Sequence, residues 1–376
     1  MPAPRNSRLP LAPVLLGLLL LASCGGGGDG GGGGEAGDGT VAGASMTSDG
    51  AAGSGPGPSA VPGAPSAAVR PAVRIPPPSL SFDDTGVSVS DGLTSNGKWW
   101  VGDLPDGLGW EYSLDMGRTW IRGGGGGFEV TGDGSKTIWV RAFDAQGNTS
   151  EIVMTSCTLD TTAPAAPQLG ALAGAVLPAI RIAGLEPMAT WEYSVDEQRS
   201  WIPGRGDTIA FAGNTIRRVW WRQADAAGNR SQAALAVLDE PDAAGWIEAS
   251  GAPLAPTALP RWEGTLLLHG EIWRPDTDFV RFDVPAGQRL RALRLVHYAS
   301  PDPIAFYALQ RGPVFDAGTD VQRMIAWKHL GPADRLANLL AQVDAGALGP
   351  GPLVLWVNQT GGERTDYAIE IELGPP

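Results

Sequence analysis

Histidine is scarce in this 376-residue sequence, and the three that occur, His269, His297 and His329, all lie in the last third. None has the His-x-x-x-His spacing of a zinc site. The sequence also lacks a Gly-x-Ser-x-Gly elbow, a glycine-rich phosphate loop and a Cys-His pair, which mark nucleophilic or phosphoryl chemistry. These absences predict that the protein is not an enzyme.

Aromatic residues are missing from the N-terminal part of the chain, and the first one is Phe82. Residues 24–79 consist mainly of Gly, Ala, Ser and Pro, which cannot bury enough apolar surface to offset the entropy of ordering. We expect this segment to be a disordered Gly/Pro-rich tether. Its r.m.s. reach would be about 40 Å for roughly 55 flexible residues.

Apolar runs long enough to span a membrane are also lacking. The N-terminal run from Leu11 to Leu21 is too short for a transmembrane helix. Arg5 and Arg8 precede this run and small residues follow it, which is the pattern of a secretory signal peptide over residues 1–23. The sequence Leu-Ala-Ser-Cys at its end resembles the lipobox of bacterial lipoproteins.

The lipobox resemblance assigns a modification to Cys24. It implies that Cys24 is diacylated, with palmitate as a typical chain, and anchors the protein in the lipid bilayer. Gly25 stands where enteric lipoproteins of the inner membrane carry aspartate, which implies the outer membrane. Cys157 is then the one thiol left, so an intramolecular disulfide is excluded and we expect Cys157 to lie buried in a strand.

Acidic residues outnumber basic ones by 40 to 27, for a formal net charge of −13. Removal of residues 1–23, which contain two arginines and no acidic residue, would leave a net charge of about −15. This acidity argues against a nucleic-acid partner and against electrostatic docking on anionic lipid. It is compatible with divalent cations.

The middle of the chain contains a tandem repeat. The segment WEYSLDMGRTW at 110–120 recurs as WEYSVDEQRSW at 191–201. VRAFDAQGNTS at 140–150 recurs as WRQADAAGNRS at 221–231. Both offsets are 81 residues without insertion, which predicts two tandem units of about that length.

Each unit alternates apolar and polar residues between turns and has no helical period, which predicts a β-sandwich. DDTGVSVSDGLTSNG, WEYSLDMGRTW, VRAFDAQGNTS and LDTTAPAAP follow one another as in the bacterial Ig-like repeats of large surface adhesins, which the sequence resembles. The second copy lacks the leading segment. The resemblance implies two Ig-like domains, at residues 80–160 and 161–241.

The segment Ser113–Trp120 also has the spacing of the Asp-box of sialidase propellers. A propeller would carry several boxes at a blade spacing of about 40–50 residues. Here there are two, 81 residues apart, and the second has Gln198 and Ser200 at the glycine and threonine positions. We therefore interpret both segments as braced turns of Ig-like hairpins and not as parts of a glycosidase.

The repeat register is lost from Trp246 onward. TDFVRFDVPAGQ, followed much later by LWV and YAIEI, resembles the pre-peptidase C-terminal domain, a small β-sandwich appended to secreted proteins. The resemblance implies a third sandwich over residues 242–376. The predicted fold is therefore all-β, with three tandem β-sandwich domains, two Ig-like and one pre-peptidase C-terminal-like, after the disordered tether.

Carboxylates near the domain joints are candidate calcium ligands, because a hard cation takes several oxygen atoms. In adhesin repeats such ions stiffen the joints, and calcium is the one cofactor considered. The resemblance nominates Asp144 and Asp160 at the first joint and Asp225 and Asp239 at the second, with Asp276 and Asp278 as a separate pair in the last domain. The alternative for Asp144 and Asp225 is that each caps its own turn.

Tryptophan occurs in two adjacent pairs, Trp99-Trp100 and Trp220-Trp221. Neighbours on a strand point to opposite faces, so one member of each pair should face outward. Alignment of the repeats indicates Trp100, and Trp220 with its equivalent Trp139. An exposed ring would stack on a sugar; the alternative is packing against long side chains or the adjacent domain.

Together these patterns predict a surface-anchored outer-membrane lipoprotein that serves as an adhesion or interaction scaffold. Its Ig-like spacers would present the C-terminal domain to an unknown protein or glycan ligand. Two alternatives remain at this point. One is a polysaccharide- or cell-wall-binding protein with tryptophan as its platform, and the other is an accessory subunit of a secreted hydrolase.

Overall fold

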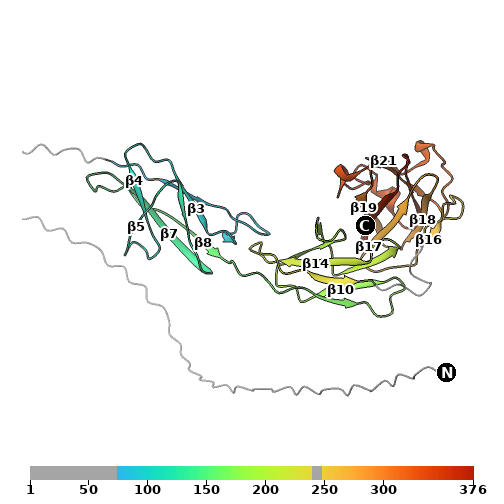
Figure 1. Ribbon diagram of the computed structural model, residues 1–376, viewed down its shortest axis with the longest axis horizontal. Coiled ribbons are helices and arrows are strands. Elements are labelled where there is room, and N and C mark those ends of the chain that lie inside the picture. The colour runs from blue at the N-terminus through green and yellow to red at the C-terminus, as the bar shows by residue number, and fades with distance from the viewer. Residues whose placement is uncertain (1–73, 239–247) are drawn as a thin grey trace, which may run out of the picture. The chain divides into compact units, whose positions relative to one another are not determined.

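The computed structural model describes residues 74–238 and 248–376 (Figure 1). These ranges contain 23 strands and three short 3-10 helices, and no α-helix. The 3-10 helices are η1 (Val321–Arg323), η2 (Pro332–Asp334) and η3 (Ala345–Leu348). The predicted all-β fold is thus confirmed, and no helix in the described ranges is long and apolar enough to cross a membrane. The signal segment, Cys24 and Asp239 lie outside the described residues.

The first unit, called repeat 1 below, is a sandwich of two sheets. The smaller sheet has the order β1-β3-β6, with β1 (Ser79–Phe82), β3 (Lys98–Gly102) and β6 (Gly127–Glu129). The larger sheet has the order β2-β8-β7-β4-β5, with β2 (Leu93–Thr94), β8 (Val153–Leu159), β7 (Gly134–Phe143), β4 (Gly109–Ser113) and β5 (Ile121–Arg122). Trp99 packs in the core with Trp110 and Cys157. Cys157 lies on β8 and is buried, as predicted.

The second unit, repeat 2, reproduces the strand positions of the first. Its strands β10 (Ala179–Ala183), β11 (Thr190–Ser194) and β12 (Ile202–Pro203) begin and end 81 residues after β3, β4 and β5. The other strands are β9 (Gln168–Ala171), β13 (Thr208–Gly213), β14 (Arg218–Ala224) and β15 (Ala234–Val237). One of its sheets has the order β12-β11-β14-β15.

The other sheet of repeat 2 continues into the last third of the chain. Strand β13 pairs in parallel with β17 (Thr265–Ile272), and the whole sheet has the order β19-β23-β17-β13-β10-β9. The remaining strands are β19 (Arg289–Ala299) and β23 (Thr365–Gly374). At the end of this pairing Gly213 has φ +132°, and a Cβ there would lie 1.6 Å from the carbonyl oxygen of His269. Only glycine fits this approach.

The C-terminal sandwich is completed by a five-stranded sheet of order β16-β18-β22-β20-β21. Its strands are β16 (Thr257–Ala258), β18 (Thr277–Val284), β22 (Gly351–Asn358), β20 (Ala305–Arg311) and β21 (Ala326–Leu330). Strand β17 is buried on both sides of the sheet. Successive strand residues face opposite sides. Leu266 and Leu268 pack in the C-terminal core, whereas Leu267 packs in the core of repeat 2. This double burial accounts for the unbroken apolar run of three leucines at 266–268.

Candidate metal centre

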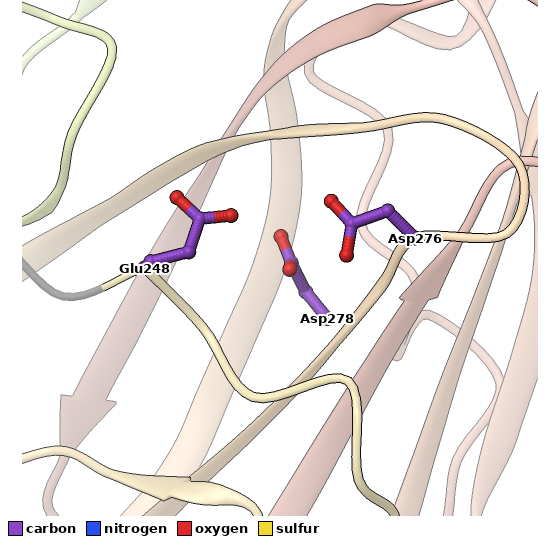
Figure 2. Close-up of side chains that lie close together, drawn as sticks. All are labelled: Glu248, Asp276 and Asp278. Carbon is purple, nitrogen blue, oxygen red and sulfur yellow. The ribbon is translucent and has the colours of Figure 1, made fainter.

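Three carboxylates meet at the start of β18 (Figure 2). Asp278 lies on β18, and Asp276 immediately precedes that strand. Glu248 comes from the segment that precedes the C-terminal sandwich. The amide of Phe279 donates to the carbonyl of Ser250 at 2.9 Å, which holds this segment beside β18.

The three side chains share one small volume. One oxygen of each carboxylate lies within 4.8 Å of the other two. Asp278 is 2% exposed, and the Tyr367 hydroxyl donates to its Oδ2 at 2.5 Å. Oδ1 of Asp278 and Oδ2 of Asp276 are buried and have no hydrogen-bond partner. Buried acceptors in folded proteins are normally satisfied, so these oxygens could accept a ligand such as an ion or a water molecule.

The electrostatics of the group also favour a cation. Burial raises the pKa of Asp278 to about 7; the hydrogen bond from Tyr367 opposes this shift, and the charges of Asp276 and Glu248 add to it. Burial, followed by the charge of Asp276, raises the pKa of Glu248 as well. Like charges at this distance are unfavourable unless protons or a cation neutralise them, and a bound cation would reverse these shifts.

Asn214 of repeat 2 contacts the group through Glu248. It follows β13, its Nδ2 donates to Oε2 of Glu248, and its Oδ1 is buried without a hydrogen-bond partner. Carboxylate and amide oxygens are ligands for hard cations, and the group contains no cysteine or histidine that would favour zinc. Oxygens within 4.8 Å of one another are close enough to share one ion with ligand distances of about 2.4 Å, which are those of calcium.

Two of the other predicted carboxylates, Asp144 and Asp225, are engaged in local turns. Oδ1 of Asp144 accepts hydrogen bonds from the amides of Gln146 (3.0 Å) and Asn148 (2.8 Å). Asp225 accepts equivalent bonds from the backbone and side chain of Asn229, both at 2.9 Å. The turn-capping alternative therefore describes Asp144 and Asp225. Within the described ranges, neither they nor Asp160 belong to a metal-ligating group like the one at β18.

Asp160 takes part in the joint between the repeats through its backbone. Its carbonyl oxygen accepts a hydrogen bond from Nδ2 of Asn229 at 2.8 Å, while its carboxylate accepts one from the amide of Thr162 at 3.0 Å. At this joint the side chain of Asn229 in repeat 2 therefore binds the backbone of Asp160 directly.

The sequence did not point to Glu248 or Asn214. Glu248 lies 28 positions before Asp276 in a segment without periodicity, and Asn214 lies in another domain. Both reach the site through tertiary contacts, so no local pattern could have identified them.

The predicted outward tryptophans differ in exposure. Trp99 is 1% exposed and Trp100 is 42% exposed, which confirms Trp100 as the outward member of its pair. Trp139 is half-buried, and a Cβ at Gly117 would lie 3.1 Å from its ring. The prediction of an exposed Trp220 is wrong, because Trp220 is 8% exposed and the guanidinium of Arg218 lies 5.2 Å from its ring centroid.

The Asp-box segments are structural braces. Asp115 accepts hydrogen bonds from the amide (2.8 Å) and hydroxyl (2.6 Å) of Thr119, and Ser113 donates to it at 2.8 Å. These hydrogen bonds, led by the Thr119 hydroxyl, lower the pKa of Asp115 to about 2. In repeat 2, Asp196 binds Ser194 and Ser200 in the same way. The carboxylate of each box is thus engaged in closing its own turn.

No family model and no curated protein matches the sequence. Among solved structures, a periplasmic g-type lysozyme inhibitor, PliG of Salmonella Typhimurium, is 16% identical; the match covers 31% of this chain and 97% of that one, with a TM-score of 0.19. Carbohydrate-binding modules of the β-sandwich superfamily are 12% identical over 79% of this chain and 96% of theirs, with a TM-score of 0.21.

A third similar structure is a tetra-tandem repeat from the extending region of a large adhesion protein. It is 13% identical over 75% of this chain and 71% of that one, with a TM-score of 0.15. At these values the comparisons assign the chain to none of these proteins. The β-sandwich fold described above rests on the chain's own strand pairing.

Proposed function

We propose that the protein is a non-enzymatic, lipid-anchored scaffold of the bacterial cell envelope, in which Ig-like domains present a C-terminal binding unit. The observation that carries this proposal is the parallel pairing of β13 with β17, which spans five residue pairs from Ile209↔Thr265 to Gly213↔His269. A continuous sheet joins repeat 2 to the C-terminal sandwich, so the two form one presenting unit.

Buried polar contacts support the same unit. Arg294 donates to Glu370 at 2.5 Å and to Glu372 at 2.7 Å within the C-terminal sandwich. Arg205 of repeat 2 lies 3.6 Å from Glu372, and Tyr193 of repeat 2 also reaches this network. Of these groups Glu370 is buried, and a buried carboxylate that loses its partners is costly, which favours a single relative arrangement of the two domains.

A protease site placed within residues 239–247 tests whether this unit exists. After cleavage, repeat 2 and the C-terminal sandwich should co-elute in native size-exclusion chromatography and separate in denaturant. Separation under native conditions would show that the shared sheet does not hold them together, and the proposed presenting unit would be lost.

The anchoring half of the proposal has its own test. Cys24→Ser should move the protein from the detergent phase to the aqueous phase on Triton X-114 partitioning, because the variant lacks the thiol that is acylated. Cys157→Ala is the matched control, since Cys157 is buried in β8 and should have no part in anchoring. Equal partitioning of Cys24→Ser and the parent protein would contradict lipidation.

A second candidate function, glycan binding, is favoured by the surroundings of Trp100. Its exposed ring borders a shallow hollow of about 510 Å³ that also contains Lys98 and Glu129. Gly127 is its cross-strand partner on β6, so the position directly opposite the ring carries no side chain. An exposed indole beside charged hydrogen-bonding groups suits stacking on a sugar ring.

A further inference from the structure

A second cavity, of about 250 Å³, lies between the Asp-box hairpin of repeat 2 and the C-terminal sandwich. The hairpin contributes Asp196, Arg199 and Ser200. Strand β19 contributes His297, and the segment after η2 contributes Arg335. Leu295, Val296 and Pro332 supply apolar lining. The cavity therefore combines two guanidinium groups, an imidazole and an apolar wall.

Arg335 is held in place by the backbone. Its Nε donates to the carbonyl of Val296 at 3.1 Å and its Nη2 donates to the carbonyl of Trp201 at 3.2 Å. One of these carbonyls belongs to β19 and the other to repeat 2, so the guanidinium bridges the joint. These two bonds leave other guanidinium N–H groups for a ligand, already oriented without further loss of side-chain entropy.

The positive charge in the cavity is only partly compensated. Neither Arg199 nor Arg335 forms an ion pair with a carboxylate of the described residues, whereas Arg141, Arg222 and Arg294 each do. The one acid in the lining, Asp196, is engaged by hydrogen bonds within its own hairpin. Burial opposes its ionisation, but the bonds from Ser200 and Ser194 outweigh burial and lower the pKa of Asp196.

The imidazole of His297 is neutral near pH 7, because burial lowers its pKa. The cavity thus holds two guanidinium groups against one carboxylate, Asp196, whose pKa the charge of Arg335 also lowers, in a chain with a net charge of −13. A concave site of one sign within a surface of the other sign attracts ligands of complementary charge.

We propose that this joint cavity binds the carboxylate group of a small acidic ligand of about the size of a uronic acid. Arg335 and Arg199 would hold the carboxylate by charge-assisted hydrogen bonds, and the apolar wall would cover the ligand's carbon skeleton. The inference does not depend on the lipid anchor or on Trp100, so it stands apart from the function proposed above.

Isothermal titration of the full-length chain with glucuronate, glucose and inorganic sulfate tests the proposal. Glucuronate should bind saturably, and glucose should bind at least about tenfold more weakly because it lacks the charge. Arg199→Ala and Arg335→Gln should each weaken glucuronate binding by about tenfold or more. Arg311→Gln is the matched control, because Arg311 also donates to backbone carbonyls but lies outside the cavity.

The outcomes separate clearly. Equal binding of glucose and glucuronate, or glucuronate binding that neither cavity variant weakens, would overturn the proposal, as would the absence of saturable glucuronate binding. Binding of sulfate without glucuronate would overturn the carboxylate assignment. If Arg335→Gln unfolds the joint, Arg199→Ala decides, because the Arg199 side chain is exposed and its removal breaks no hydrogen bond within the described residues.

Discussion

The hydroxyl of Tyr193 donates a hydrogen bond to Oε2 of Glu370 at 3.1 Å, across 177 positions of sequence. Tyr193 is fully buried and Glu370 is 2% exposed. The tyrosine belongs to a hairpin of repeat 2, whereas the glutamate lies on the last strand of the C-terminal sandwich. The contact therefore joins the buried interior of repeat 2 to that of the C-terminal sandwich.

Tyr193→Phe should lower the free energy of unfolding by about 1–2 kcal/mol, because it removes one donor from a buried carboxylate. Urea denaturation of the full chain measures this change. The matched control is Tyr112→Phe, the position 81 residues earlier, whose hydroxyl makes no hydrogen bond to the described residues. Equal effects of the two variants would show that the contact between the domains contributes nothing specific.

Acid should weaken the joint at His269. Its Nδ1 accepts hydrogen bonds from the amides of Thr215 and Ile216, both at 3.1 Å. Burial, with the charge of Arg217 acting in the same direction, lowers the pKa of His269 from 6.5 to about 3. The unfolded chain therefore takes up a proton below pH 6.5 that the folded chain excludes. The contribution of His269 to stability is complete above pH 6.5 and is lost as the pH falls toward 3.

The slope from this one residue is at most about 1.4 kcal/mol per pH unit. His269→Asn places an amide oxygen near the position of Nδ1 and cannot titrate, so its stability should depend less on pH between about 6.5 and 3 than that of the parent. Denaturant midpoints recorded across this window provide the comparison. Parallel curves for the two proteins would contradict a buried neutral histidine.

Much of the fold follows from local sequence pattern. The alternation in WEYS and the 81-residue offset predicted strands that the structure places at matching positions, such as β4 and β11. The shared sheet was not predictable, because alternation fixes which face a residue occupies and not which strand lies beside it. One sequence feature indicated the shared sheet. The three consecutive leucines at 266–268 do not alternate with polar residues, as expected for a strand buried on both faces.

The candidate site was also predictable only in part, because some of its residues meet through tertiary contacts and not through a local sequence pattern. Asp276 and Asp278 were named from the sequence as a candidate pair in the last domain, and the structure brings their carboxylates together. Glu248 and Asn214 join them through tertiary contacts that no period encodes. The error at Trp220 has a related cause, because outward direction on a strand does not reveal whether a neighbour such as Arg218 covers the ring.

Calcium should raise the thermal unfolding midpoint of the protein, because an ion that binds the folded state stabilises it by mass action. Asp278→Asn should abolish this rise, since it removes a buried ligand charge. Asp283→Asn, an exposed position on the same strand, should retain it. Differential scanning calorimetry with calcium and with EGTA gives the measurement. A midpoint that does not change between calcium and EGTA would rule out the site.

The pair Trp99-Trp100 separates a structural role from a binding role. Trp99→Ala should destabilise the protein by about 3–5 kcal/mol, because it removes a large buried side chain and leaves a cavity in the core of repeat 1. Trp100→Ala should change stability by less than about 1 kcal/mol, because its ring is largely exposed. Thermal denaturation of both variants checks the assignment of the two faces of β3.

If repeat 1 binds glycans, Trp100→Ala should also abolish binding on a glycan array, since stacking on the indole would supply most of the contact. Trp327→Ala is the matched control, because Trp327 is 45% exposed but lies on the C-terminal sandwich. Array binding that survives Trp100→Ala and is lost with Trp327→Ala would move the glycan site to β21. Binding that neither variant affects would leave Trp100 as a surface residue without a ligand and would favour the scaffold function alone.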